Sequence, residues 1–159
     1  MGVIQMQRKR EAGFTLVELM VTIIVLAVMT MIAIPAFMSW MPGIRLNGAA
    51  RQVMGDLMGA RMNAVKQNNE FKVFFNSPGT NQYQILDDND NDGIADTGEA
   101  ITTKNIQDNY HDVTFSSTSD PIFFPRGTAY GTIVTVTNSK GAQKKVKVHL
   151  TGRIMIEDV

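Results

Sequence analysis

Cysteine is absent from this chain, and histidine occurs only twice in its 159 residues. Without cysteine there can be no disulfide bond, no thiolate nucleophile and no thiolate zinc site. The two histidines, His111 and His149, lie far apart and have no metal-ligand spacing between them. A Ser-His-Asp spacing, a glycine-rich phosphate loop and a zinc motif are also missing from the sequence. The sequence therefore argues against an enzyme.

Charge is nearly absent from residues 14–44, where Glu18 is the only charged side chain. An apolar run of about 20 residues is long enough to cross a bilayer as a helix. Because Arg8, Lys9 and Arg10 precede this run, the positive-inside rule predicts a cytoplasmic N-terminus and an exported remainder. A carboxylate in a span costs about 2.5 kcal/mol or more at the helix centre, and less near an end. Something must compensate that cost, so we interpret Glu18 as functional.

The pattern after the apolar run predicts that the helix continues as an amphipathic stem over residues 45–69. Apolar residues recur there at steps of three and four, which places them on one helix face. These residues are Leu46, Ala50, Val53, Leu57, Ala60 and Ala64. Pro35 lacks a backbone donor and is predicted to bend the helix. The pair Pro42-Gly43 leaves the continuity of the helix open, because it could form a flexible joint or a simple bend.

Residues 70–159 have the pattern of an antiparallel β head domain. The predicted strands are residues 71–75, 82–86, 100–106, 113–115, 132–136, 145–150 and 153–156. A turn at residues 138–141 predicts a hairpin, in which Val146, Val148 and Leu150 alternate with polar residues and face the core. One long helix followed by a small antiparallel sheet predicts an α+β fold.

An acidic segment, residues 87–99, interrupts the predicted strands. Its residues 88–99 match the twelve-residue EF-hand calcium loop at each defining position, with Gly93 at the sharp turn. The predicted ligands are Asp88, Asp90, Asp92, the Ile94 carbonyl, Asp96 and Glu99. Without an ion these carboxylates would repel one another. The alternative is a solvated turn that binds nothing. We predict a structural calcium ion, held in a loop between strands rather than between helices.

Five basic residues gather around the predicted hairpin and the segment after it. They are Lys140, Lys144, Lys145, Lys147 and Arg153. One interpretation is a charged strand edge that blocks strand addition and keeps the domain soluble. The other is contact with DNA phosphates, for which Lys144, Lys145, Lys147 and Arg153 are the candidate residues. The sequence shows no evident aromatic platform for base stacking beside the lysines.

The N-terminal region resembles the class III signal of type IV prepilins and type II secretion pseudopilins. The residues that carry the resemblance are Gly13, Phe14, Thr15, Leu16, Val17 and Glu18, with Pro35 further along. The resemblance implies that a prepilin peptidase removes residues 1–13 by cutting after Gly13, and then methylates the new amino group of Phe14. It also implies that Glu18 neutralises the N-terminal amine of a neighbouring subunit in a filament, where pairing removes the cost of two isolated charges in lipid. The alternative is an ordinary signal anchor with an accidental Gly-Phe pair.

The C-terminal half resembles the globular domain of GspH/FimT minor pseudopilins. Residues 123–127 match a Phe-x-x-x-Gly corner, and Gly152-Arg153 match a closing Gly-Arg pair. Members of the FimT branch linked to natural transformation bind DNA through Gly-Arg-x-Arg. Met155 stands here in place of the second arginine, which weakens that inference. Pro42-Gly43 is a second departure from the family pattern.

Together these features predict a non-enzymatic minor pilin or pseudopilin, at or near the tip of a type II secretion pseudopilus or a type IV pilus. The expected organisation is a leader at 1–13, a transmembrane half-stem at 14–44, an amphipathic half-stem at 45–69 and a head at 70–159. The expected location is the inner membrane with a periplasmic head, and then a filament in the periplasm or at the cell surface. The expected partners are prepilin peptidase, other pilins or pseudopilins, and secretion cargo. The alternatives are a DNA-binding uptake subunit, a major filament subunit and a signal-anchored enzyme.

Overall fold

The structure is a computed structural model that describes residues 13–159, and the predicted leader therefore lies outside the described residues except for Gly13. The chain divides into two compact units between residues 39 and 40. One helix, α1 (Leu16–Gln67), passes through both units. The second unit, residues 40–159, contains the C-terminal part of α1, the strands and a short 3₁₀ turn. The name head refers from here on to this whole unit, including its part of the helix.

Helix α1 begins and ends at recognisable caps. The Glu18 backbone N–H donates to the Thr15 hydroxyl at 3.2 Å, which caps the first turn. Asn68 adopts a left-handed conformation (φ +59°) after the last turn, and the Asn69 N–H returns to the Ala64 carbonyl. The helix is continuous through Pro35 and through Pro42-Gly43, so the break that the second pair left open does not occur. The bend at Pro35 stays a prediction.

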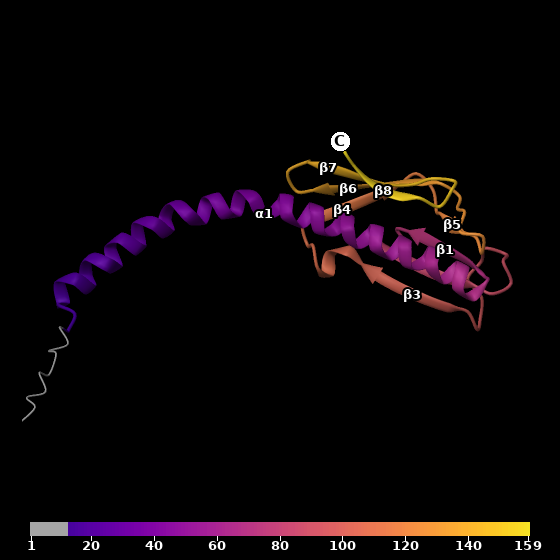
Figure 1. The fold of residues 1–159 in the computed structure, drawn as a ribbon, viewed down its shortest axis with the longest axis horizontal. Helices are drawn as coiled ribbons and strands as arrows, with labels where there is room; N and C mark the ends of the chain where they lie inside the picture. The colour runs from indigo at the N-terminus through magenta and orange to yellow at the C-terminus, as the bar shows by residue number, and fades with distance from the viewer. Residues whose placement is uncertain (1–12) are drawn as a thin grey trace, which may run out of the picture. The chain divides into compact units, whose positions relative to one another are not determined.

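The strands form two antiparallel sheets, and not the single small sheet that the sequence predicted. The first sheet has the order β3-β2-β1-β5, and the second has the order β4-β6-β7-β8. The first contains β1 (Glu70–Phe75), β2 (Gln82–Asp88), β3 (Ala100–Asn105) and β5 (Ile122–Phe123). The second contains β4 (Val113–Ser117), β6 (Thr132–Asn138), β7 (Gln143–Val148) and β8 (Ile154–Asp158), and the turn η1 (Ile106–Asp108) follows β3. Figure 1 shows α1 passing between β3 and the strands of the second sheet.

Both sheets and α1 share one hydrophobic core. The helix contributes the predicted stripe together with Pro42 and Ala49, and every member of that stripe is buried. Phe75, Tyr83 and Phe115 pack against one another, with ring centroids 5.4 to 5.9 Å apart. The amphipathic stem and the α+β fold are therefore confirmed.

Leu150 does not have the buried position that strict alternation predicted. Strand β7 ends at Val148, and a turn follows in which the Gly152 N–H donates to the His149 carbonyl. Leu150 lies in that turn and is 71% exposed. The prediction for Leu150 was wrong because the alternation of apolar and polar residues in the sequence continues past Val148, where the strand ends.

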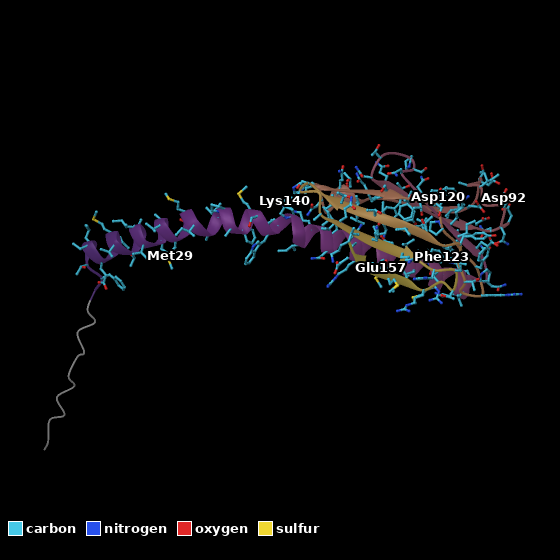
Figure 2. The ribbon with its side chains drawn as sticks, turned by 90° about the horizontal axis from the view of Figure 1, so that it is seen from above. Met29, Asp92, Asp120, Phe123, Lys140 and Glu157 are labelled. Carbon is cyan, nitrogen blue, oxygen red and sulfur yellow. The ribbon has the colours of Figure 1, made fainter. Side chains whose placement is uncertain are left out.

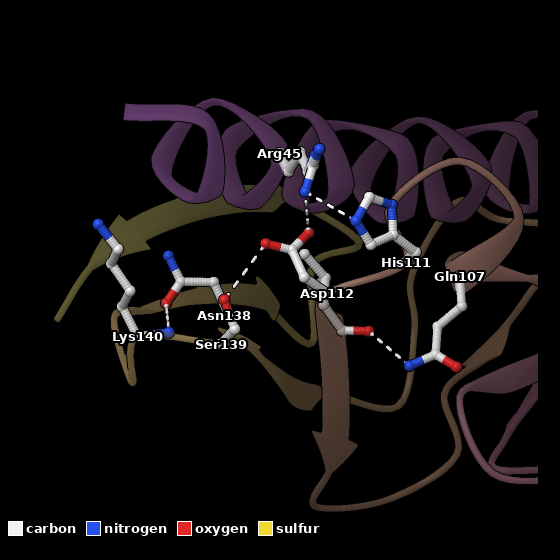
Figure 3. A network of polar contacts seen from close by, with 8 residues as sticks. Arg45, Gln107, His111, Asp112, Asn138, Ser139 and Lys140 are labelled. Atoms are coloured by element: carbon white, nitrogen blue, oxygen red, sulfur yellow. Dashed lines mark hydrogen bonds and ion pairs between the residues drawn. The ribbon is translucent and has the colours of Figure 1, made fainter. Parts of the chain in front are cut away.

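A polar network attaches α1, near the point where it enters the head, to the segment before β4 (Figure 3). Arg45 Nη1 lies 2.9 Å from His111 Nε2 and 3.3 Å from Asp112 Oδ1. Ser139 donates to the other oxygen of Asp112 at 3.4 Å. The side chain of Asp112 is only 11% exposed, so its ion pair with Arg45 compensates much of the cost of its burial.

Candidate functional site

The first turn of α1 carries a carboxylate that nothing in the described chain compensates. Thr15 and Glu18 have the spacing of a capping box, and the Glu18 backbone N–H is bonded to the Thr15 hydroxyl. The Glu18 carboxylate itself has no hydrogen-bond or ion-pair partner within residues 13–159. Beside it, Phe14 is 79% exposed. A charge in this position requires a partner from beyond the described residues once the helix enters lipid.

The first unit is an apolar helix without a protein core around it. Every large hydrophobic side chain from Phe14 to Met38 is at least half exposed. By length and composition, α1 is the only helix within the described residues that could cross a membrane. An apolar surface of this extent is stable only when lipid or other apolar helices cover it.

The carboxylates of the acidic segment converge in two overlapping groups. Oxygen atoms of Asp88, Asp90 and Glu99 lie within 4.8 Å of one another, and so do those of Asp90, Asp92 and Asp96. Calcium binds oxygen at about 2.3–2.6 Å, so two ligands on opposite sides of one ion are about 5 Å apart. Each group of three carboxylates therefore has a spacing that could hold a cation. Figure 2 shows Asp92 at the margin of the head.

Backbone amides hold the loop in its wound conformation. Asp88, which is fully buried, accepts from the Asp92 N–H at 3.2 Å and from the Gly93 N–H at 2.8 Å. Glu99 accepts from the Asn89 and Asp96 N–H groups with its two oxygens. Gly93 has a φ of +75°, which supplies the sharp turn that the pattern requires at this position. The Ile94 N–H donates to Asp92 at 2.7 Å.

The loop is attached to the junction between α1 and β1. Asn69 donates to Asp87 at 2.8 Å and to Asn89 at 3.0 Å. Lys72 donates to the Gly93 carbonyl at 2.8 Å, and the Glu70 N–H donates to the side chain of Asn91. An ion in the loop would therefore also stabilise the place where the stem helix passes into the first sheet.

Two carboxyl groups in this region are harder to ionise than usual. Lost hydration raises the pKa of Asp90 above its ordinary value, and the neighbouring carboxylates of Asp92, Glu99 and Asp88 add to the shift. Partial burial raises the pKa of Glu70, and the charge of Asp88 contributes further. Both shifts have causes that a bound cation would offset.

The basic residues of the hairpin face carboxylates on the neighbouring strand. Lys144 forms an ion pair with Asp158, and Lys147 lies 3.8 Å from Glu157. Lys145 is directly opposite Glu157 in the register of β7 and β8. Arg153 is exposed, and no ion pair involves it in the described part of the chain. Two of the four candidate DNA contacts therefore already have a carboxylate partner on β8.

The corner at residues 123–127 and the closing Gly-Arg pair meet at the stem. The Arg61 guanidinium donates to the Gly127 carbonyl at 2.8 Å. A Cβ on Gly152 would lie 2.0 Å from that same carbonyl oxygen and 2.7 Å from the guanidinium. Gly127 and Gly152 both have positive φ, at +79° and +77°. The two sequence motifs therefore form one packing joint against α1.

This joint lies inside the region that a known family model recognises. The model of the type II transport protein GspH matches residues 49–152, which is more than half of the chain. The chain belongs to the GspH family. A second model, the prokaryotic N-terminal methylation motif, matches residues 8–34. Together the two matches identify the chain as a GspH/FimT-like type IV pilin. The proteins of this family are structural pilins and pseudopilins.

Two solved structures have the same fold as this GspH-family chain. The type IV minor pilin FimU of Pseudomonas aeruginosa matches with a TM-score of 0.54 and 16% identity, over 70% of this chain and 87% of its own. The minor pseudopilin EpsH of the Vibrio cholerae type 2 secretion system matches with a TM-score of 0.57 and 10% identity, over 72% and 97%. No curated protein matches by sequence.

Sequence reasoning missed several residues that shape these sites. Asn69 and Lys72 hold the acidic loop, yet neither belongs to the loop motif. Arg61 bonds to the corner from 66 residues away in sequence. Tyr83 donates to Asp56 at 2.5 Å, and burial together with that hydrogen bond raises its pKa well above the ordinary range. No local pattern distinguishes these side chains from other polar residues on the same elements.

Proposed function

We propose that this GspH-family chain is cut after Gly13, methylated at Phe14 and incorporated as a minor subunit of a type II secretion pseudopilus or type IV pilus. The observation that carries this proposal is the Glu18 carboxylate, which no residue in 13–159 compensates, on an exposed and otherwise apolar helix. A bundle of such helices covers the apolar surface, and the amine of a neighbouring subunit supplies the missing charge. The head then lies on the periplasmic side of the inner membrane, as expected from the basic residues before the span.

The tip of the filament is the position that we propose. Two of the solved structures with this fold are described as a minor pilin and a minor pseudopilin. A subunit present in few copies can act where few copies suffice, as at the end of a filament where assembly begins or cargo is contacted. A major subunit would instead be abundant in sheared filaments, which separates these two alternatives.

The mature N-terminus tests the proposed processing. We expect the chain purified from its native membrane to start at an N-methylated Phe14, as read by intact mass and N-terminal sequencing. The peptidase recognises the leader and Gly13, so the mature chain should lack residues 1–13. A chain that retains Met1 would contradict the proposal and leave an ordinary signal anchor.

We also propose that the acidic loop binds one calcium ion in a structural role. The two overlapping groups of carboxylates, the buried Asp88 and the positive φ of Gly93 support this proposal. Bound calcium would replace the amide contacts of Glu99 and neutralise part of the crowded negative charge. Because the loop is bonded to Asn69 and Lys72, the ion would stabilise the junction of α1 with the first sheet.

Calcium is expected to raise the melting temperature of the detergent-solubilised mature chain. A free concentration of 100 times Kd adds about 2.7 kcal/mol to the free energy of unfolding. For a domain of this size that corresponds to a rise of roughly 10 °C. Magnesium should raise the melting temperature by less than calcium does, because magnesium prefers smaller octahedral sites with bound water.

A pair of matched variants completes the calcium experiment. Glu99→Gln should remove most of the calcium-dependent rise, because a bidentate carboxylate is lost. Asp108→Asn, an acidic residue of the turn η1 outside the loop, should leave the rise unchanged. A wild-type chain that melts at the same temperature in calcium and in chelator would identify the loop as a solvated turn.

DNA uptake is the second candidate function, with Lys144, Lys145, Lys147 and Arg153 as the contacts. The ion pairs of Lys144 and Lys147 with Asp158 and Glu157 favour the filament role, because phosphates would have to displace them. A mobility-shift titration of the protein with DNA separates the two functions. A variant in which Lys144, Lys145 and Lys147 are all replaced is its control.

A further inference from the structure

Strand β3 is the outer strand of the first sheet, and its free side has no partner within residues 13–159. It pairs only with β2, from Asn105 opposite Gln82 to Ala100 opposite Asp87. None of its backbone groups bonds to any other described segment. In an antiparallel ladder, alternate residues direct their N–H and C=O groups away from the partner strand. The outer side of β3 is therefore a row of unused hydrogen-bond donors and acceptors.

The other sheet edges in the described chain are covered, short or charged. The outer side of β5, which is two residues long, is covered by the segment around Ala129. The outer side of β4 is covered by the buried Asn81, whose side chain accepts from the Phe115 N–H at 3.3 Å. Strand β8 ends in Glu157 and Asp158.

Strand β3 lacks these forms of protection. It contains no proline, and its one charged residue, Lys104, has its ammonium group 2.5 Å from Asp56 on α1. The lysine is therefore directed at the helix and does not block the edge. Ile101, Thr102 and Thr103 are exposed β-branched residues, which are well suited to pairing with another strand.

A groove of about 370 Å³ lies between this edge and α1. Ala100, Thr102 and Lys104 line it from β3, and Gly55 and Gly59 line it from the helix. A Cβ on either glycine would meet nothing within 4 Å. Glycine weakens a helix relative to alanine, and the packing of the head requires neither glycine. The glycines therefore leave space that the isolated head does not use (Figure 1 shows β3 beside the second half of α1).

We infer that β3 is a docking edge for an extended segment of a neighbouring filament subunit. The segment pairs with β3 as a fifth strand and places its inward side chains over Gly55 and Gly59. Strand β3 has six residues, so the paired length is about 20 Å. Three charged residues line the groove. Asp56 and Lys104 pair with each other, and Asp87 accepts a hydrogen bond from Asn69, so uncharged side chains fit over the glycines. This inference rests on the filament assembly proposed above.

Photo-crosslinking of the full chain in its native membrane tests the docking edge. A benzophenone amino acid replaces Thr103, whose side chain lies on the face of β3 away from the groove. The matched control is the same amino acid at Thr114, an exposed threonine of the covered edge strand β4. We expect an adduct with another subunit from Thr103, because cross-strand side chains lie about 5 Å apart. Equal adducts from both positions would overturn the inference.

Two substitutions at Gly59 distinguish filling of the groove from a change in helix stability. Gly59→Ala removes the glycine but adds one carbon, and should leave the Thr103 adduct in place. Gly59→Leu fills the groove and should lower the yield of the Thr103 adduct about tenfold, which corresponds to a tenfold loss of docking affinity. An undiminished adduct in the leucine variant would show that the partner does not enter the groove.

A probe in the stem distinguishes failure of docking from failure of assembly. Ile24 is 60% exposed in the first unit, and a photoreactive residue there reports contacts between stems. Stem adducts without a Thr103 adduct would overturn the β3 docking edge and leave filament assembly intact. The absence of both adducts would overturn the assembly proposal together with the inference.

Discussion

Replacing Gly152 with alanine is expected to lower the melting temperature of the head by roughly 10 °C or more. The new Cβ would lie 2.0 Å from the Gly127 carbonyl oxygen and 2.7 Å from the Arg61 guanidinium. The backbone at Gly152 also has a φ of +77°, a conformation that costs an L residue about 1–2 kcal/mol. Forcing atoms into a packed site adds about 1–3 kcal/mol. At several degrees per kcal/mol, a total of about 3 kcal/mol gives the expected shift.

Gly141→Ala is the matched control for that experiment. Gly141 has a similar φ of +80°, but a Cβ there would meet nothing within 4 Å. Its substitution should therefore cost only the backbone strain, about 1–2 kcal/mol, or several degrees of melting temperature. Thermal unfolding of the three chains, followed by circular dichroism, gives the comparison. Equal losses for the two alanine variants would contradict the close contact of Gly152 with Gly127.

This contact gives the closing Gly-Arg pair a structural explanation. Gly152 has to lack a side chain because the corner glycine, Gly127, and Arg61 of the stem occupy the space beside it. Three segments distant in sequence meet at this joint. The glycine of the motif is therefore required for packing, and only the exposed Arg153 remains available for a ligand.

The stem was predictable from sequence because its determinants are local. The stripe from Leu46 to Ala64 repeats with the period of a helix, and each member is buried as predicted. The division of the strands into two sheets was not predictable, because it depends on long-range pairing. Strand β5 pairs with β1, and β4 pairs with β6. The local alternation of polar and apolar residues indicates neither pairing.

The candidate sites divide in the same way. The spacing of Asp88, Asp90 and Glu99 is a local motif, and the structure brings these carboxylates together. The partners of the hairpin lysines come from β8, so their neutralisation appears only once the register of β7 and β8 is known. The edge of β3 likewise follows from strand order, since its sequence alone resembles that of any short strand.

Removing the charge of Glu18 is expected to lower incorporation into filaments at least tenfold while leaving membrane insertion unchanged. The apolar helix remains long enough to span the bilayer without this residue. In the proposed pairing, the neighbouring amine loses its partner and would stay charged and unpaired among apolar stems. Breaking a buried ion pair costs about 3 kcal/mol or more, and each 1.4 kcal/mol is about one decade in an equilibrium constant. Membrane and sheared-filament fractions, quantified by immunoblot, measure insertion and incorporation separately.

Glu18→Gln and Glu18→Ala distinguish charge pairing from helix capping. Thr15 and Glu18 form a capping-box sequence, and the Glu18 N–H is bonded to the Thr15 hydroxyl. Glutamine retains the capping capacity of this position but not its charge, whereas alanine removes both. If the charge is what assembly requires, the two variants should fail alike, and Thr15→Ala should assemble nearly normally. Normal incorporation of the glutamine variant would show that assembly does not require the charge, and the pairing of Glu18 with a neighbouring amine would have to be abandoned.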